Sequence, residues 1–102
     1  MGIELVWVEE SGAELARLGD PKSLMQKWLP PEPALEFACL RFVDPYGDTV
    51  FNTLQLPVLL QELKKCHSIS LEFSVAEHLD EAIALVSKSQ GYIHTYIRFV
   101  GD

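Results

Sequence analysis

The length of the chain is its strongest constraint, because 102 residues can enclose one hydrophobic core and not two. Two cores of about 50 residues each would bury too little surface to be stable without disulfides or metals. The sequence is 48% hydrophobic, which is enough to fill one interior. Its longest apolar runs fall far short of the ~20 residues that span a bilayer, and Glu4 interrupts any signal-peptide pattern. We therefore expect a single folded domain over residues 1–102, with no membrane partner.

Two kinds of hydrophobic pattern follow one another along the chain and predict an α+β fold. Segments with alternating apolar residues, or rich in β-branched and aromatic residues, predict the strands: 3–8, 35–43, 48–52, 68–73 and 92–100. Segments with apolar residues at helical spacing predict the helices: 11–18, 21–28, 57–66 and 74–90. The expected fold is a mainly antiparallel sheet of four or five strands with helices packed on one face. The expected order is β-α-α-β-β-α-(β)-α-β.

Caps and turns give these elements their expected ends. Ser11 and Ser74, each followed three residues later by a glutamate, form capping-box patterns that predict helix starts. Asp20 is expected to cap the second helix, with Pro21 in its first turn. The sequence Asp44-Pro45-Tyr46-Gly47 is typical of a type I turn, so segments 35–43 and 48–52 are predicted to pair as a hairpin.

The residue types that usually carry chemistry do not form a recognisable set. His67, His78 and His94 have no local metal-ligand spacing, and the glycines form no phosphate-binding loop, so we expect no metal and no cofactor. Cys66 and His67 are adjacent only in sequence, which on a helix separates their side chains by about 100°. Cys39 and Cys66 are interpreted as buried free thiols, and a disulfide between them is the alternative. Free thiols favour a reducing compartment and a cytoplasmic location.

The charge of the chain limits its partners. There are 15 acidic residues against 8 basic ones, and a net charge of −7 opposes binding to nucleic acid and to anionic lipid. A basic protein partner is compatible with it. Two candidate binding surfaces follow. The first is the acidic face of the last predicted helix, formed by Glu77, Asp80 and Glu81 at spacings of three and four. The second is one face of the last predicted strand, formed by Tyr92, His94, Tyr96 and Arg98, residue types favoured in binding hot spots.

Two short segments resemble those of a known family. The run Asp44-Pro45-Tyr46-Gly47-Asp48-Thr49 with Phe51-Asn52, and the C-terminal Phe99-Val100-Gly101-Asp102, are similar to segments of a family of short uncharacterised bacterial proteins. That family has no assigned activity, cofactor or catalytic residues. The resemblance therefore implies a bacterial source and no particular function.

Two hypotheses about function follow from the sequence. The first is a non-enzymatic protein-interaction module, of which a small inhibitor or immunity-type protein that binds a basic partner is one case. The alternative is a small-ligand-binding or enzymatic domain that uses His94, Tyr96 and Arg98 around a pocket near the C-terminal strand. A homodimer, formed through a free edge of that strand, is a further hypothesis.

Overall fold

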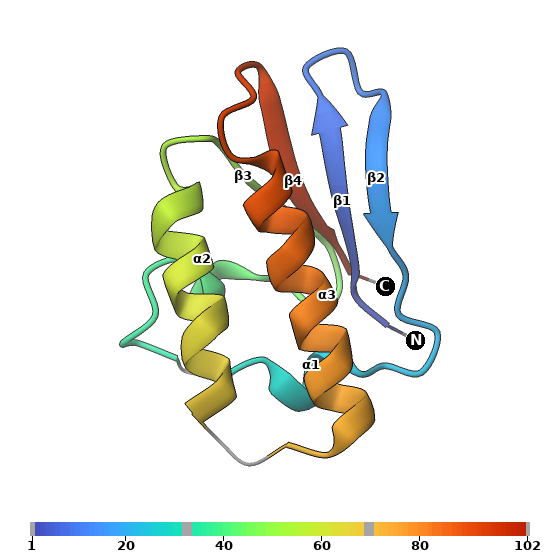
Figure 1. The fold of residues 1–102 in the computed structure, drawn as a ribbon, viewed down its shortest axis with the longest axis vertical. Helices are drawn as coiled ribbons and strands as arrows, with labels where there is room; N and C mark the ends of the chain where they lie inside the picture. The colour runs from blue at the N-terminus through green and yellow to red at the C-terminus, as the bar shows by residue number, and fades with distance from the viewer. Residues whose placement is uncertain (1, 32–33, 69–70, 102) are drawn as a thin grey trace.

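The computed structural model of the chain describes residues 2–31, 34–68 and 71–101. Within them, four antiparallel strands form one sheet in the order β2-β1-β4-β3. The strands are β1 (Glu4–Glu9), β2 (Glu14–Leu18), β3 (Asp48–Phe51) and β4 (Thr95–Val100). The α-helices are α1 (Met25–Trp28), α2 (Leu56–Lys65) and α3 (Phe73–Ser89), with two short 3-10 helices, η1 (Leu40–Phe42) and η2 (Cys66–Ser68). The predicted α+β fold is confirmed, with a sheet of four strands (Figure 1).

The core lies between the sheet and the two long helices, which cover one of its faces (Figure 1). Strands from the two ends of the chain meet in the middle of the sheet, where Leu5 pairs with Phe99 and Trp7 with Ile97. All four side chains are buried against the helices. The helices contribute the apolar stripes that their sequence spacing predicted. The stripes comprise Leu59, Leu63 and Cys66 of the segment 57–66, and Leu79, Ala82 and Val86 of α3.

The helix predicted over residues 11–18 is wrong, because this segment turns and returns as strand β2. Gly12 adopts a positive φ of 95°, and its N–H donates to the carbonyl of Glu9 at 2.8 Å, which closes a tight turn. After the turn, Ala16 and Leu18 pack against the core while Arg17 between them points to the other face. Pairing with β1 therefore overrides the local helical preference.

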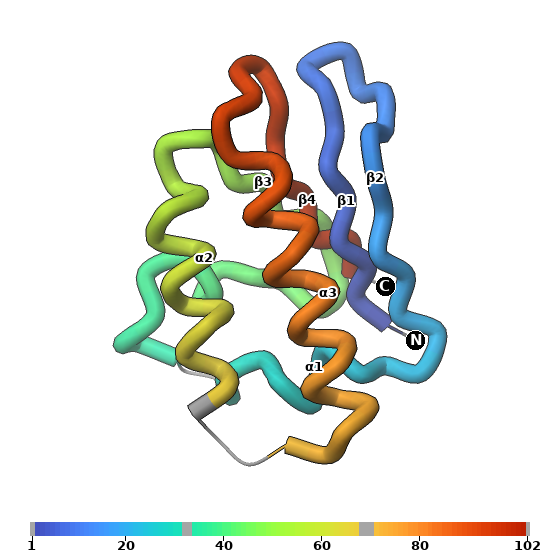
Figure 2. Tube along the Cα trace, viewed as in Figure 1, coloured from blue at the N-terminus to red at the C-terminus, as the bar shows by residue number. Residues whose placement is uncertain are grey.

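The strand predicted over residues 35–43 and its hairpin with 48–52 are also wrong. Residues 35–43 form turns and the 3-10 helix η1, and β3 pairs with β4 instead. The connection from α1 to β3 passes alongside α2 (Figure 2). Glu62 of α2 explains its shape, since the buried carboxylate accepts the backbone N–H groups of Ala38, Cys39 and Leu40. Those donors are therefore not available to a sheet.

Three other predicted boundaries change. α1 is only one turn long and begins at Met25, not near Pro21, although Asp20 does accept the backbone N–H groups of Leu24 and Met25 at 2.6 and 3.1 Å. α3 begins at Phe73, and no side chain caps it, so Ser74 is not its N-cap. β4 begins at Thr95, not at residue 92.

The short strand predicted over residues 68–73 falls partly outside the described residues, which omit 69 and 70, and residue 68 belongs to η2. Residues 71 and 72 belong to no regular element, and Phe73 is already helical. The fifth strand is therefore absent from the part of this segment that the structure describes.

The turn at residues 44–47 forms as predicted and is held by the C-terminal end of the chain. The N–H of Gly47 donates to the carbonyl of Asp44 at 3.3 Å, and the Asp44 carboxylate accepts the N–H of Tyr46 at 2.9 Å. Gly101 then packs on this turn, with its N–H 2.8 Å from the Gly47 carbonyl. A Cβ at position 101 would lie 2.5 Å from the backbone of Pro45. The turn and the C-terminus therefore form one structural unit with β3 and β4.

Candidate functional site

The acidic residues of α3 form one exposed face of that helix. Glu77, Asp80 and Glu81 are all exposed, and Asp80 lies 2.7 Å from the Nε2 atom of His67. Among the described residues, neither Glu77 nor Glu81 has an ion-pair partner. Phe73 lies one helical turn before Glu77 and is 81% exposed. We call Phe73, Glu77, Asp80 and Glu81 the acidic α3 face.

Phe73 is the member of this face that sequence reasoning missed. The segment 68–73 was predicted as a strand, in which Phe73 shares one side with Ile69 and Leu71. The signal that could have found it is the spacing of four residues to Glu77, which puts both side chains on one side of a helix.

The four residues predicted as one surface of the last strand are split by the structure. Tyr92 and His94 precede β4. The Tyr92 ring packs edge-on against Trp7 with 5.0 Å between ring centroids. His94 has a positive φ of 60° and lies 3.1 Å from the Glu10 carboxylate. Only Tyr96 and Arg98 lie on the same face of β4, because they are two residues apart on a strand.

That face of β4 belongs to the side of the sheet opposite the helices. The strand register places the following residues there: Glu4, Val6 and Val8 of β1, Glu14 and Arg17 of β2, Asp48 and Val50 of β3, and Tyr96, Arg98 and Val100 of β4. We call this set the open face. No helix of the described chain packs on it (Figure 1).

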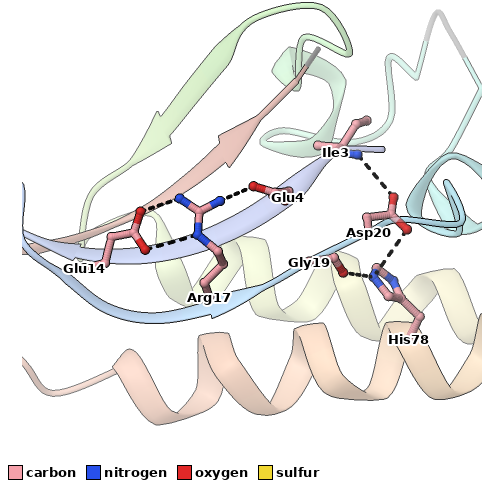
Figure 3. Close-up of polar contacts among 7 residues, drawn as sticks. All are labelled: Ile3, Glu4, Glu14, Arg17, Gly19, Asp20 and His78. Carbon is pink, nitrogen blue, oxygen red and sulfur yellow. Dashed lines mark hydrogen bonds and ion pairs between the residues drawn. The ribbon is translucent and has the colours of Figure 1, made fainter. Parts of the chain in front are cut away.

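One edge of the open face carries an ionic cluster around Arg17. The guanidinium contacts the carboxylates of both Glu4 and Glu14 (Figure 3). The hydrogen bond from Arg17 lowers the pKa of the Glu14 carboxyl, and the same bond raises the pKa of Arg17. These side chains are about 40% exposed, so the cluster adds little to stability.

Arg98 lies near the middle of the open face and is not satisfied in the same way. In the sheet it is flanked by Val6 of β1 and Val50 of β3. Its Nε atom is buried, and within the described residues it has no hydrogen-bond partner. An unpaired buried N–H of this kind costs about 1–3 kcal/mol. After Arg17, the charge of Arg98 also contributes to the lowered pKa of Glu14, so Arg98 attracts this carboxylate within one copy, although its Nε has no acceptor among the described residues.

His78 belongs to a buried polar cluster that is fully used by the fold. Its Nδ1 accepts the indole N–H of Trp28 at 3.0 Å. Because an indole N–H can only donate, the proton of the neutral imidazole lies on Nε2, which is 3.2 Å from the Gly19 carbonyl and 3.6 Å from Asp20 (Figure 3). The Asp20 carboxylate also accepts the N–H of Ile3 at 3.2 Å. Both ring nitrogens of His78 bind other parts of the fold, α1 and the residue after β2, so the role of this histidine is structural.

Both cysteines are buried free thiols, as predicted. Burial, with the charge of Glu62 as a second cause, raises the pKa of Cys39 and raises that of Cys66 to about 11. The Cys66 sulfur also lies 3.4 Å from the carbonyl of Glu62. A thiolate is therefore scarce at neutral pH, and neither cysteine is arranged as a nucleophile.

Two hollows on the surface of the described residues bear on the ligand-binding hypothesis. One of about 300 Å³ is lined by the turn before α2, the turn before β4 and the start of β4, including Leu54, Ile93, His94 and Tyr96. Arg98 does not line it. A larger one of about 650 Å³ lies where Ile3, α1 and the turn at 44–46 meet. His94 and Tyr96 therefore line one hollow. Arg98, the third residue of the ligand-binding hypothesis, does not.

Metal, membrane and family evidence add no further site. Within residues 2–31, 34–68 and 71–101, no three His, Cys, Asp or Glu side chains are grouped to hold a metal ion. In the same ranges, no helix has the length and apolar character that crossing a membrane requires. Comparison with family models, curated proteins and solved structures finds no match to the chain.

Proposed function

We propose that this protein is a non-enzymatic interaction module that binds a basic protein partner through the acidic α3 face. A small inhibitor or immunity-type protein of the bacterial cytoplasm is the concrete case. The observation that carries the proposal is that Glu77 and Glu81 are exposed and have no ion-pair partner among the described residues, on the same helix face as the exposed ring of Phe73. The free, buried thiols support a reducing compartment.

The charges and the aromatic ring of this face have different roles in the proposed binding. The sequence has no lysine or arginine between Lys65 and Lys88, so no nearby cation of α3 neutralises the glutamates. A net charge of −7 attracts a basic protein from a distance and speeds association. An exposed aromatic ring can fill a pocket on the partner and slow dissociation.

A pair of charge reversals tests the face against the charge of the whole chain. The protein, immobilised, is used to capture partners from a lysate of its source cells, with E77K/E81K and the control E9K/E36K beside it. Both double variants change the net charge by the same amount, and Glu9 and Glu36 are exposed residues of other elements, the end of β1 and the turn before η1. A basic protein retained by wild type and by E9K/E36K, but lost by E77K/E81K and weakened by Phe73→Ala, would support the proposal.

The opposite pattern would count against it. Equal capture by wild type and E77K/E81K, or capture that is insensitive to salt, would show that the acidic α3 face is not the contact. Loss of binding only in Tyr96→Ala would favour the hollow at His94 and Tyr96, and with it the alternative of a small-ligand or enzymatic site.

A further inference from the structure

The open face divides into two halves of different charge. The half formed by β2 and β1 holds the cluster of Glu4, Glu14 and Arg17, in which two carboxylates share one guanidinium. This half therefore has one negative charge in excess. The half formed by β4 and β3 holds Arg98, whose buried Nε has no acceptor within the described residues. Asp48 lies at the corner of that half, two positions from Val50, so this half is neutral overall, with its positive charge at Arg98 in the middle of the face.

We propose that a second copy of this chain covers the open face, with the two copies related by a two-fold axis that runs along the strands. Such an axis places the β2 and β1 half of one copy over the β4 and β3 half of the other. Because Arg98 pairs with Val6 in the sheet, each Arg98 then lies opposite the partner subunit's Val6, at a height between its Glu4 and Glu14, and reaches for the excess carboxylate of that pair. The contact occurs twice by symmetry, and it satisfies the donor that one copy leaves unpaired.

The apolar part of the face fits the same arrangement. Val50 is exposed, and Tyr96 and Val100 are half-buried, so all three have surface left to bury. Packed sheets lie about 10 Å apart, with their inner side chains interdigitated. The result is two layers of strands inside and the helices of each copy outside, which leaves both acidic α3 faces in solvent.

The size of the face predicts a weak dimer. The strands have six, five, four and six residues, and at about 3.4 Å per residue and a spacing of about 4.8 Å they cover about 340 Å² in projection. A standard stable interface buries about 800 Å² on each partner. We therefore expect association that depends on concentration, with dissociation in the micromolar range, and not an obligate dimer.

The strand edges are poorer sites for self-association than the face. β4 has neighbours on both sides, so the free edge expected for it does not exist. Edge strand β2 has a shift in register opposite Trp7 and Val8, and edge strand β3 has only four residues. Short or bulged edges are features that oppose pairing between molecules.

Charge exchange across the interface provides the test. Sedimentation velocity of the full chain should show a dimer that forms as the concentration rises from low micromolar to near-millimolar. R98E alone and E4K/E14K alone should each dimerise at least ten-fold more weakly, because each opposes like charges twice. An equimolar mixture of R98E and E4K/E14K should recover the dimer. In one of its two contacts the reversed charges of the two variants attract each other, and in the other contact Arg98 meets Glu4 and Glu14 as in wild type. Circular dichroism confirms folding, and Val50→Glu replaces R98E if that variant unfolds.

Several results would overturn the proposal. These are a monomer at every concentration, a dimer that R98E or Val50→Glu leaves intact, or a mixture that stays monomeric. E77K/E81K serves as the control, because its side chains lie on the helical side of the molecule and it should dimerise like wild type. This control also separates the two proposals, since R98E should still bind a basic partner, and failure of either measurement leaves the other standing.

Discussion

Replacing Glu62 by glutamine should strongly destabilise the fold. The Glu62 side chain is 5% exposed and accepts three consecutive backbone N–H groups, those of residues 38–40. A hydrogen bond to a charged acceptor contributes about 1.5–3 kcal/mol. Glutamine keeps one of the two side-chain oxygens, which still accepts. The other oxygen is replaced by an NH2 group, a donor that would face a backbone N–H and cannot accept from it. Because the three bonds share one group and are not additive, we expect a loss of about 3–5 kcal/mol.

Urea denaturation followed by far-UV circular dichroism measures this loss. A domain of this size has about 5–15 kcal/mol of stability, so the variant should remain folded with a midpoint lower by about 2 M or more. The matched control is Glu77→Gln, an exposed carboxylate on α3, which should change stability by less than about 0.5 kcal/mol. If both variants shifted the midpoint equally, the segment 38–40 would not depend on this carboxylate. A second measurement is thiol labelling, which should be faster in Glu62→Gln because the Glu62 charge contributes to the raised pKa of Cys66.

Three other outcomes are expected. Gly101→Ala should cost about 1–3 kcal/mol in thermal unfolding, because its Cβ would lie 2.5 Å from the backbone of Pro45, whereas Gly19→Ala, with its nearest contact at 3.9 Å, should be nearly neutral. Ser74→Ala should leave stability within about 0.5 kcal/mol, because Ser74 does not cap α3, and a loss near 1 kcal/mol would restore the sequence-based cap. Stability should fall as pH rises from about 9 to about 11: the unfolded chain ionises Cys66 from about pH 9, while the folded thiol, with its pKa of about 11, keeps its proton. At about 1.4 kcal/mol for each pH unit, the loss is about 2–3 kcal/mol, and Cys66→Ser should show a flatter profile.

The parts of the fold that the sequence predicts are those in which one element contains its own signal. α3 carries a continuous apolar stripe, and its predicted boundaries differ from the observed ones by only one residue at each end. The strands β1 and β4 were found from their alternating apolar residues. The predictions over 11–18 and 35–43 are wrong because the deciding contact lies elsewhere in the chain. Strand β2 depends on pairing with β1, and the irregular segment depends on Glu62, which is 22–24 residues away.

The candidate surfaces show the same division. Glu77, Asp80 and Glu81 share one helix, so their spacing alone places them together. Tyr92 and His94 were grouped with Tyr96 because the strand was predicted to begin three residues too early. The cluster around Arg17 was not found, because it joins two strands, one of which was taken for a helix.

The buried cluster around His78 relates the two proposed surfaces to each other. Through its two ring nitrogens, His78 joins α3 to Trp28 of α1 and to Gly19 at the end of β2, while Asp20 joins that same end to Ile3 beside β1. These bonds hold α3 in a fixed position over the sheet, so the acidic α3 face points away from the open face. A dimer built on the open face would therefore present two acidic faces on its outer sides. A basic partner with two binding sites at a matching distance would gain avidity from this arrangement, because the second contact forms within one complex. R98E removes the dimer and keeps each acidic face. It should therefore lower the affinity for a partner with two binding sites and leave the affinity for a single-site partner unchanged.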